Sequence, residues 1–331
     1  MKVFIDTNIY LTFYHYTSED LEELKKLSVA IKNKKIDLQL TDQVISEFKR
    51  NREAKIFDAL KKFEDQVLNN QFPQICKEYP EYEHLKDAVR KYEESKDKIM
   101  QKLYKDIENI ELGADKIIND LFLKGNVHKT DNDNFKKARI RINLGNPPGK
   151  NNSLGDAINW EILLSEIPNK ESLYLISDDK DYFSPINKDM LANFLNDEWQ
   201  KAKNSNIYFY RRLSDFFRDK FPKIKLASEL EKELVISDLI FGENFKEVHK
   251  VIAKLSKYAD FTDQQVNEII DASISNNQVR WISEDPDIKT FFNNLLKDRD
   301  QIVEPDKLEK FTKLFLNTKK EESVESDIIP F

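Results

Sequence analysis

The feature that most constrains this 331-residue chain is a short apolar run, residues 3–5, that ends directly in Asp6. A buried parallel strand has this continuous apolar character. In an open α/β sheet, ligands bind outside the carboxyl ends of the strands. The pattern therefore predicts a strand that places Asp6 where chemistry usually occurs. A helix cap or an ion pair would account for Asp6 equally well at this point.

The same arrangement returns near residue 173. An apolar run, residues 173–176, is followed by Ser177 and then by three acids, Asp178, Asp179 and Asp181. Like charges this close repel one another and lower stability. A cation or a fixed set of hydrogen bonds would neutralise that repulsion. The second run therefore predicts another strand that ends at a charged site.

Two further acids lie between these runs. Glu47 sits within an apolar helical pattern, and Asp156 follows Gly155 at the start of a strongly apolar helix. Glu47 would otherwise be a solvated helix acid, and Asp156 would otherwise suit the helix dipole. Asp42 competes with Glu47 for the same role but fits better as a helix cap.

Together, the four segments resemble PIN-domain metal-dependent nucleases. That family has a first-strand Asp followed by Thr-Asn, a Glu on an early helix, an Asp opening a later helix, and Ser/Thr-x-Asp after the next strand. The corresponding positions are Asp6, Glu47, Asp156 and Asp179, and the resemblance covers roughly residues 1–215 with a large insert. The glycine-rich stretch 145–156 is similar to a bacterial PIN-like group.

The resemblance implies a hard-metal site. Mg²⁺ and Mn²⁺ prefer carboxylate and water oxygens, and one or two such ions would offset about four converging negative charges. We expect the four family positions to be catalytic and to hold the metal, with Asp181 as an additional ligand. The four histidines show no zinc spacing. The residues expected to support the acids are Thr7, Asn8, Ser177 and Asp178.

The activity implied by the resemblance is hydrolysis of a phosphodiester by metal-activated water. The family favours RNA without excluding single-stranded DNA, and it implies 3′-hydroxyl and 5′-phosphate products. A non-cleaving scaffold that binds RNA or a protein partner is an alternative from another class. A phosphatase of the haloacid-dehalogenase type is a weaker alternative, because Asn8 stands where its second Asp would be.

Basic residues offer candidate phosphate contacts. The net charge of −7 argues against a general nucleic-acid coat protein, but local basic patches can still hold phosphates. Arg211 and Arg212 form one such cluster. The residues that we expect to contact substrate are Lys49, Arg50, Lys150 and Lys180.

Alternating strands and helices predict an α/β fold with a PIN-like central parallel sheet flanked by helices. Strands are expected at 3–5, 37–41, 173–177 and 207–210, and helices near 19–33, from 43, and at 155–166, 187–203 and 213–220. We expect a PIN-like nuclease domain over 1–222, with an almost entirely helical insert over about 60–143. Residues 223–331 predict a small all-helical module with a mobile charged tail, which could dock a protein partner.

Composition is consistent with a folded cytoplasmic protein. No apolar run approaches the roughly 20 residues of a membrane helix, and no signal-peptide pattern precedes the first strand. Cys76 is the only cysteine, so an intrachain disulfide is impossible and a reducing compartment fits. The pattern does not indicate an oligomeric state.

Overall fold

The computed structural model describes residues 1–14, 21–68, 71–149, 153–222, 224–258, 260–297, 299 and 302–315. The chain forms two compact units, Met1–Ala227 and Ser228–Phe331. Lys150 and the charged tail lie outside the described residues.

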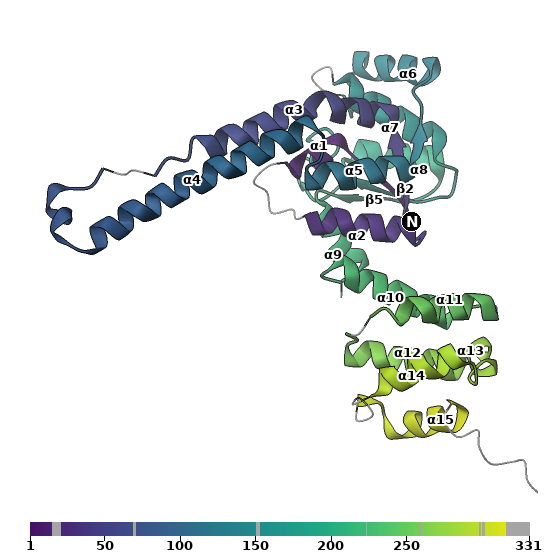
Figure 1. The fold of residues 1–331 in the computed structure, drawn as a ribbon. Coiled ribbons are helices and arrows are strands. Elements are labelled where there is room, and N and C mark those ends of the chain that lie inside the picture. The colour runs from purple at the N-terminus through teal and green to yellow at the C-terminus, as the bar shows by residue number, and fades with distance from the viewer. Residues whose placement is uncertain are drawn as a thin grey trace, which may run out of the picture. The chain divides into compact units, whose positions relative to one another are not determined.

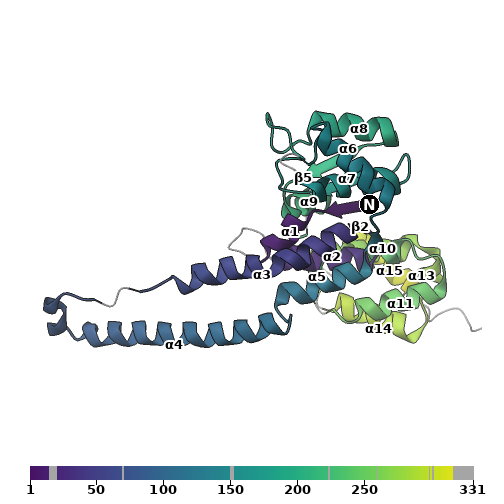
Figure 2. The same ribbon diagram turned by 90° about the horizontal axis from the view of Figure 1, so that it is seen from above.

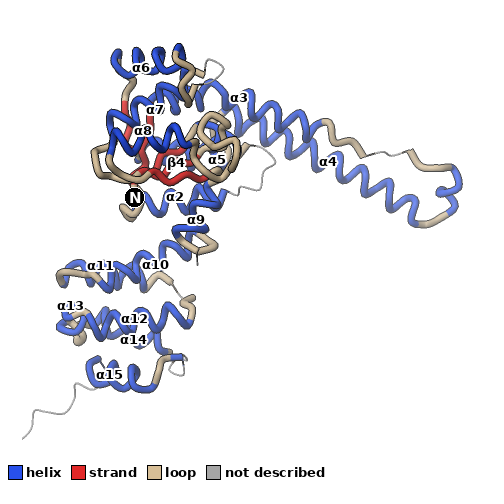
Figure 3. The backbone as a smooth tube through the Cα atoms, turned by 180° about the vertical axis from the view of Figure 1, so that it is seen from behind, coloured by secondary structure: helices blue, strands red, loops and turns tan. Residues whose placement is uncertain are grey.

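A five-stranded parallel sheet forms the centre of the first unit (Figure 3). The strands are β1 (Lys2–Ile5), β2 (Asp37–Thr41), β3 (Asn126–His128), β4 (Leu173–Ile176) and β5 (Ile207–Tyr210). Their order is β3-β2-β1-β4-β5, so the chain first builds outward from one side of β1 and then from the other. The reversal places a topological switch point between β1 and β4, which is where ligands bind in open α/β sheets. The predicted fold class is confirmed.

Helices cover the sheet on both faces. They are α1 (Thr7–Thr12), α2 (Leu21–Lys32), α3 (Asp42–Glu64), α4 (Glu81–Glu108), α5 (Gly113–Lys124), α6 (Asn132–Asn143), α7 (Leu154–Glu166), α8 (Asn193–Lys203) and α9 (Leu213–Lys220), with a 3₁₀ helix η1 (Gln74–Glu78). Figure 1 shows α2 and α7 on opposite sides of the strands. Helix α7 is buried almost throughout, and its Trp160 is fully covered. An apolar helix of this kind must pack on both the sheet and its neighbours.

The expected, almost entirely helical insert is confirmed, with one unpredicted addition: Asn126–His128 forms β3 and pairs in parallel with β2. One local expectation was wrong. The helix expected from residue 187 begins at Asn193 instead. Before it, Phe183 and Leu191 form an antiparallel bridge, and the Ala192 amide donates to the Tyr182 carbonyl at 2.8 Å. These contacts close a loop that holds residues 183–191 out of the helix.

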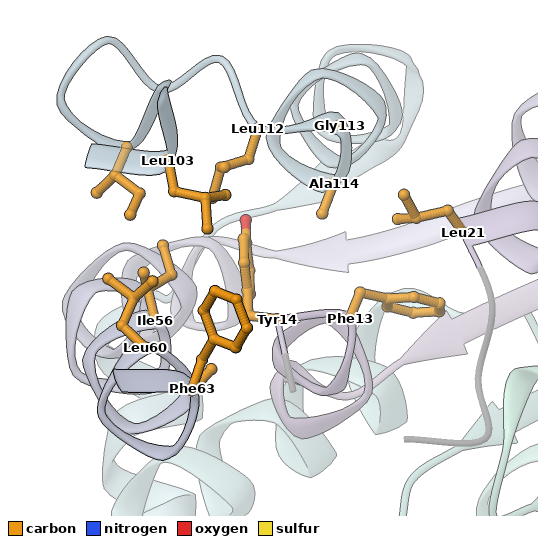
Figure 4. A pocket seen from close by; sticks show the side chains of 12 residues that line it. Phe13, Tyr14, Leu21, Ile56, Leu60, Phe63, Leu103, Leu112, Gly113 and Ala114 are labelled. Carbon is orange, nitrogen blue, oxygen red and sulfur yellow. The ribbon is translucent and has the colours of Figure 1, made fainter. Parts of the chain in front are cut away.

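Helices α3 and α4 form a long arm that runs away from the sheet (Figures 1 and 2). Most of the arm is exposed, although Val89 and Met100 of α4 are buried. At its base lies an apolar cavity of about 330 Å³, where side chains of α3, α4, α5 and the end of α1 face one another (Figure 4). Tyr14 reaches into this cavity among aliphatic neighbours such as Leu103 and Leu112.

In the second unit, every described element is a helix. Helix α10 (Ala227–Ile240) begins at the unit boundary and is followed by α11 (Phe245–Leu255), α12 (Asp263–Ser275), α13 (Asn277–Trp281), α14 (Pro286–Leu296) and α15 (Pro305–Phe315). Helix α12 starts with a capping box between Thr262 and Gln265. Phe292 lies in the apolar core and contacts Phe311 at a ring-centroid distance of 5.1 Å. This unit therefore has a hydrophobic core of its own.

Candidate active site

Asp6 is held at the switch point between β1 and β4. The pairing of Ile5 with Ile176 brings the ends of the two strands together, and the Asp6 amide donates to the Ile176 carbonyl at 2.9 Å. The Ser177 hydroxyl donates to Asp6 Oδ2 at 2.6 Å, and the Thr7 amide donates to Oδ1 at 2.7 Å. Both carboxylate oxygens are therefore oriented by neutral donors. With 3% exposure, Asp6 is almost fully buried.

Glu47 comes to the same place from α3. The Thr7 hydroxyl donates to Glu47 Oε2 at 2.9 Å, and Nε2 of the Gln43 side chain donates to Oε1 at 2.6 Å. A Cβ atom placed on Gly155 would lie 1.8 Å from Glu47 Oε1, so the backbone of α7 passes directly against this carboxylate. Only glycine permits such an approach. Thr7 thus links the end of β1 to α3. Because Gly155 has no side chain, α7 can pack directly against the Glu47 carboxylate.

Asp156 stands in the first turn of α7. The Ser153 hydroxyl donates to Asp156 Oδ2, and the Tyr182 hydroxyl donates to the Asp156 carbonyl at 3.5 Å. One turn further on, the Thr41 hydroxyl donates to Asn159 Oδ1 at 2.6 Å. That bond ties α7 to the carboxyl end of β2. The local structure therefore fixes both the depth and the direction of the helix that carries Asp156.

The three acids that follow β4, Asp178, Asp179 and Asp181, differ in their contacts. The Asp179 amide donates to Ser177 Oγ at 3.1 Å, and Asp179 Oδ1 accepts from the Asp181 amide at 2.8 Å. Asp181 is buried, and its Oδ2 accepts from the Gly149 amide at 3.0 Å, which joins this turn to the glycine-rich loop. Asp178 is exposed instead and forms an ion pair with Arg211 at 2.6 Å. Its expected support of the acid cluster is therefore not seen.

The electrostatics tie four acids together. Burial raises the pKa of Asp6 to about 7, and the charges of Asp179 and Glu47 add to the rise, while hydrogen bonds from Ser177 and Thr7 oppose it. Burial likewise raises the pKa of Asp156 to about 8, and the nearby charges of Asp6, Asp179 and Glu47 contribute. The charges of Glu47 and Asp179 therefore act on both Asp6 and Asp156 through a low-dielectric space.

The donor set fits a hard cation in its chemistry. Its side chains offer carboxylate oxygens, their charges repel one another, and the buried Asn8 Oδ1 finds no hydrogen-bond donor within the described part of the chain. Mg²⁺ or Mn²⁺ would relieve this repulsion. Across the described ranges, however, no three His, Cys, Asp or Glu side chains are already arranged to hold a metal ion.

The remaining predicted residues lie at the rim or elsewhere. Lys49 and Arg50 are exposed on α3 just after Glu47, and Lys180 is exposed between Asp179 and Asp181. The structure also adds residues that the sequence analysis did not single out as site residues. Gln43 precedes Glu47 by four positions, a spacing that places both on one helix face. Ser153 precedes Asp156 by three positions, as in a capping pattern, so both contacts had a local signal.

Comparison with known proteins defines the class of this site. A family model described as PIN domain matches residues 3–182, which is more than half of the chain. The chain therefore belongs to the PIN-domain family, which has a nuclease-type fold that typically uses divalent metals. No curated protein and no solved structure matches the chain. None of the described helices combines the length and apolar character required to cross a membrane.

Proposed function

We propose that this PIN domain is a divalent-metal-dependent nuclease that hydrolyses phosphodiester bonds of RNA. The observation that carries the proposal is the burial of Asp6 and Asp156 among other carboxylates, which raises the pKa of both groups. Buried carboxyl groups that no basic side chain of the described residues pairs with are suited to bind an added cation, which would favour their ionised form. Asp6, Glu47, Asp156 and Asp179 would hold one or two Mg²⁺ or Mn²⁺ ions, with Asp181 beside them.

Bound ions would supply an activated water and neutralise charge on the attacked phosphate. The protein's own contribution is orientation. Ser177 and Thr7 fix both oxygens of Asp6, while Thr7 and Gln43 fix Glu47. Asp181 braces the turn that carries Asp179. Such supporting hydrogen bonds typically change metal affinity or activity by about 10- to 100-fold.

A non-cleaving RNA-binding scaffold is the second candidate. It is favoured by the finding that no metal-holding group of three side chains is preformed within the described residues. The phosphatase alternative has less support, because Asn8 stands where the expected second acid would be.

The test is cleavage of end-labelled single-stranded RNA in Mn²⁺, Mg²⁺ or EDTA. We expect cleavage in Mn²⁺ or Mg²⁺, none in EDTA, and products with 3′-hydroxyl and 5′-phosphate ends. Asp6→Asn and Asp156→Asn should each lower the rate by at least about a hundredfold. Asp133→Asn is the matched control, because Asp133 is an exposed helix acid paired with Lys137. Wild-type rates in Asp156→Asn would refute the assignment, and stoichiometric binding without cleavage in any divalent metal would favour the scaffold.

A further inference from the structure

A polar hollow of about 480 Å³ lies at the carboxyl end of β5, on the same edge of the sheet as the acids. Its volume falls within the range of small-ligand pockets, roughly 300–1,000 Å³. Two half-buried aromatic residues, Phe209 and Tyr210, contribute to its wall. Arg211 follows them directly at the end of the strand. The hollow thus combines aromatic surface with a guanidinium group.

Short contacts connect this hollow to the acid cluster. The Ser177 amide donates to the Tyr210 carbonyl at 3.0 Å, and Ser177 also holds Asp6. The next residue, Asp178, accepts from Arg211 Nε at 2.7 Å and pairs with its Nη2 at 2.6 Å. A ligand in the hollow would therefore contact Tyr210 and Arg211, which bond directly to Ser177 and Asp178 at the end of β4.

Arg211 is held in place but not covered. Asp178 engages one edge of its guanidinium, and the group stands 5.3 Å from the centroid of the Phe183 ring. The Arg211 side chain keeps 29% exposure. Because the guanidinium has five donors in a fixed fork, an ion pair on one edge leaves others that can meet a phosphate. Asp178 does not join the acid cluster. In this arrangement it positions the guanidinium group of Arg211.

The charges of the hollow decide what kind of ligand fits. Arg211 and Arg218 face three aspartates, Asp189, Asp215 and Asp219. Arg218 pairs with Asp215, and Asp219 accepts from the Tyr210 hydroxyl at 2.5 Å. The lining holds three acids and two arginines, and Lys220 pairs with Asp219 at 3.0 Å, so the hollow has no excess of positive charge and is not a general polyanion surface. Carboxylates do accept hydrogen bonds from sugar hydroxyls and base amino groups, while aromatic faces stack on bases.

We propose that this hollow binds one ribonucleotide unit of single-stranded RNA next to the cleaved bond, with Arg211 on its phosphate. The inference rests on the proposed nuclease function and adds a substrate subsite to it. The aromatic wall would meet the base, and the aspartates would accept from the ribose 2′-hydroxyl. RNA is therefore the expected ligand over DNA of the same sequence.

The first test measures binding without cleavage. Single-stranded RNA of about eight nucleotides, within the usual site size, is titrated in EDTA and followed by fluorescence anisotropy. Arg211→Ala should weaken binding by about tenfold and reduce the slope of log K against log salt by about 0.7, as expected for one lost phosphate contact on a single strand. The affinity of Arg211→Lys for RNA should lie between those of the wild type and Arg211→Ala, because lysine keeps the charge but lacks the planar fork of donors.

The matched control is Arg90→Ala on the arm, where Arg90 forms an exposed ion pair with Asp87 at 3.0 Å. It should bind like wild type. Unchanged binding in Arg211→Ala, or an equal loss in Arg90→Ala, would overturn the subsite. Thermal unfolding verifies that each variant is folded.

The second test compares RNA with DNA of the same sequence on the wild-type protein. A hydrogen bond from the 2′-hydroxyl to a carboxylate predicts a preference for RNA of about tenfold, and equal affinities would contradict the proposal. The two hypotheses fail differently. If no divalent metal supports cleavage but Arg211→Ala weakens RNA binding in EDTA, the nuclease proposal is refuted and the subsite stands. If cleavage is normal but Arg211→Ala does not change RNA binding, the subsite is refuted and the nuclease proposal stands.

Discussion

Asp115 and Asp6 are both almost fully buried, with 1% and 3% exposure, yet the chain treats their charges in opposite ways. Asp115 accepts from Arg52 Nε at 2.7 Å and pairs with Nη2 at 2.5 Å, and the Tyr14 hydroxyl donates to it as well. Within the described residues, Asp6 accepts from two neutral donors, Ser177 and Thr7, and it is repelled by Asp179 and Glu47. The chain supplies a cationic partner for Asp115, whereas Asp6 has none among the described residues.

This contrast separates structural charge from candidate functional charge. The Arg52–Asp115 pair joins α3 to α5 at the base of the arm, beside the apolar cavity that Tyr14 enters (Figure 4). Hydrogen bonding to Asp115 raises the pKa of Arg52, so the guanidinium stays charged. Asp6 and Asp156 form no ion pair within the described residues, and perturbed groups of this kind cluster at functional sites.

The largest expected effect comes from breaking the neutralised pair. Arg52→Ala would leave Asp115 buried and unpaired, which should lower the free energy of unfolding by about 3–5 kcal/mol. Urea unfolding followed by circular dichroism measures this. Arg90→Ala, which breaks an exposed pair, should change the same quantity by less than about 1 kcal/mol. Equal losses in the two variants would show that burial does not distinguish these pairs.

The next effect concerns the geometry of the acid cluster. Gly155→Ala would place a methyl group 1.8 Å from Glu47 Oε1, so either Glu47 or α7 must move. A displacement of about 1 Å at a reacting centre costs on the order of a hundredfold in rate. We expect that loss in Mn²⁺-dependent RNA cleavage. The control is Gly113→Ala, whose added methyl would meet Leu21 at an ordinary 3.4 Å. An active Gly155→Ala protein would mean that the position of Glu47 is not critical.

Much of this arrangement follows from local sequence patterns. The apolar runs that end in Asp6 and in Ser177 each predict a strand without reference to the rest of the chain, and parallel packing then brings their ends together. The roles of the acids in catalysis and metal binding stay predictions. The location of a charged site could be predicted, because a few residues are enough to show both a buried apolar strand and the acids that follow it.

Other features depend on partners distant in sequence. Asn126–His128 has no apolar run of its own, and it becomes a strand because β2 offers a free edge for Val127 to pair with Leu40. Asp178 looks like a third acid of the cluster until pairing of β4 with β5 brings Arg211 beside it. Such contacts join residues tens of positions apart, so local periodicity carries no trace of them.

A smaller effect is expected from a supporting hydroxyl. Ser177→Ala removes the donor to Asp6 Oδ2 and the acceptor for the Asp179 amide. Because the Ser177 bond lowers the pKa of Asp6, its loss should raise that pKa further and weaken metal binding. We expect about a tenfold decrease in cleavage at limiting Mn²⁺. Ser165→Ala, which removes a hydroxyl bonded only to a helix carbonyl at 2.9 Å, provides a comparison that should retain full activity. Full activity in Ser177→Ala as well would contradict the proposal that Ser177 orients Asp6.

The smallest expected effect is a pH dependence of the metal-free protein. Burial and neighbouring charge raise the pKa of Asp156 to about 8 from 3.8. A raised folded-state pKa contributes stability that is complete below the unfolded value and is lost as the pH rises toward the folded value. Between pH 6 and 7 the unfolded group is ionised while the folded group stays protonated. From pH 6 to pH 7, the free energy of unfolding of the wild type should therefore fall by about 1 kcal/mol more than that of Asp156→Asn.

Urea unfolding in EDTA at the two pH values measures this difference, with Asp133→Asn expected to follow the wild type. Saturating Mn²⁺ should abolish the extra loss, because the ionised carboxylates then act as ligands and the folded state no longer favours the proton. Parallel pH curves for wild type and Asp156→Asn in EDTA would mean that solvent or a rearrangement already relieves the acid cluster. The contrast with Asp115 would then lose its physical basis, since both buried acids would be neutralised without an added cation.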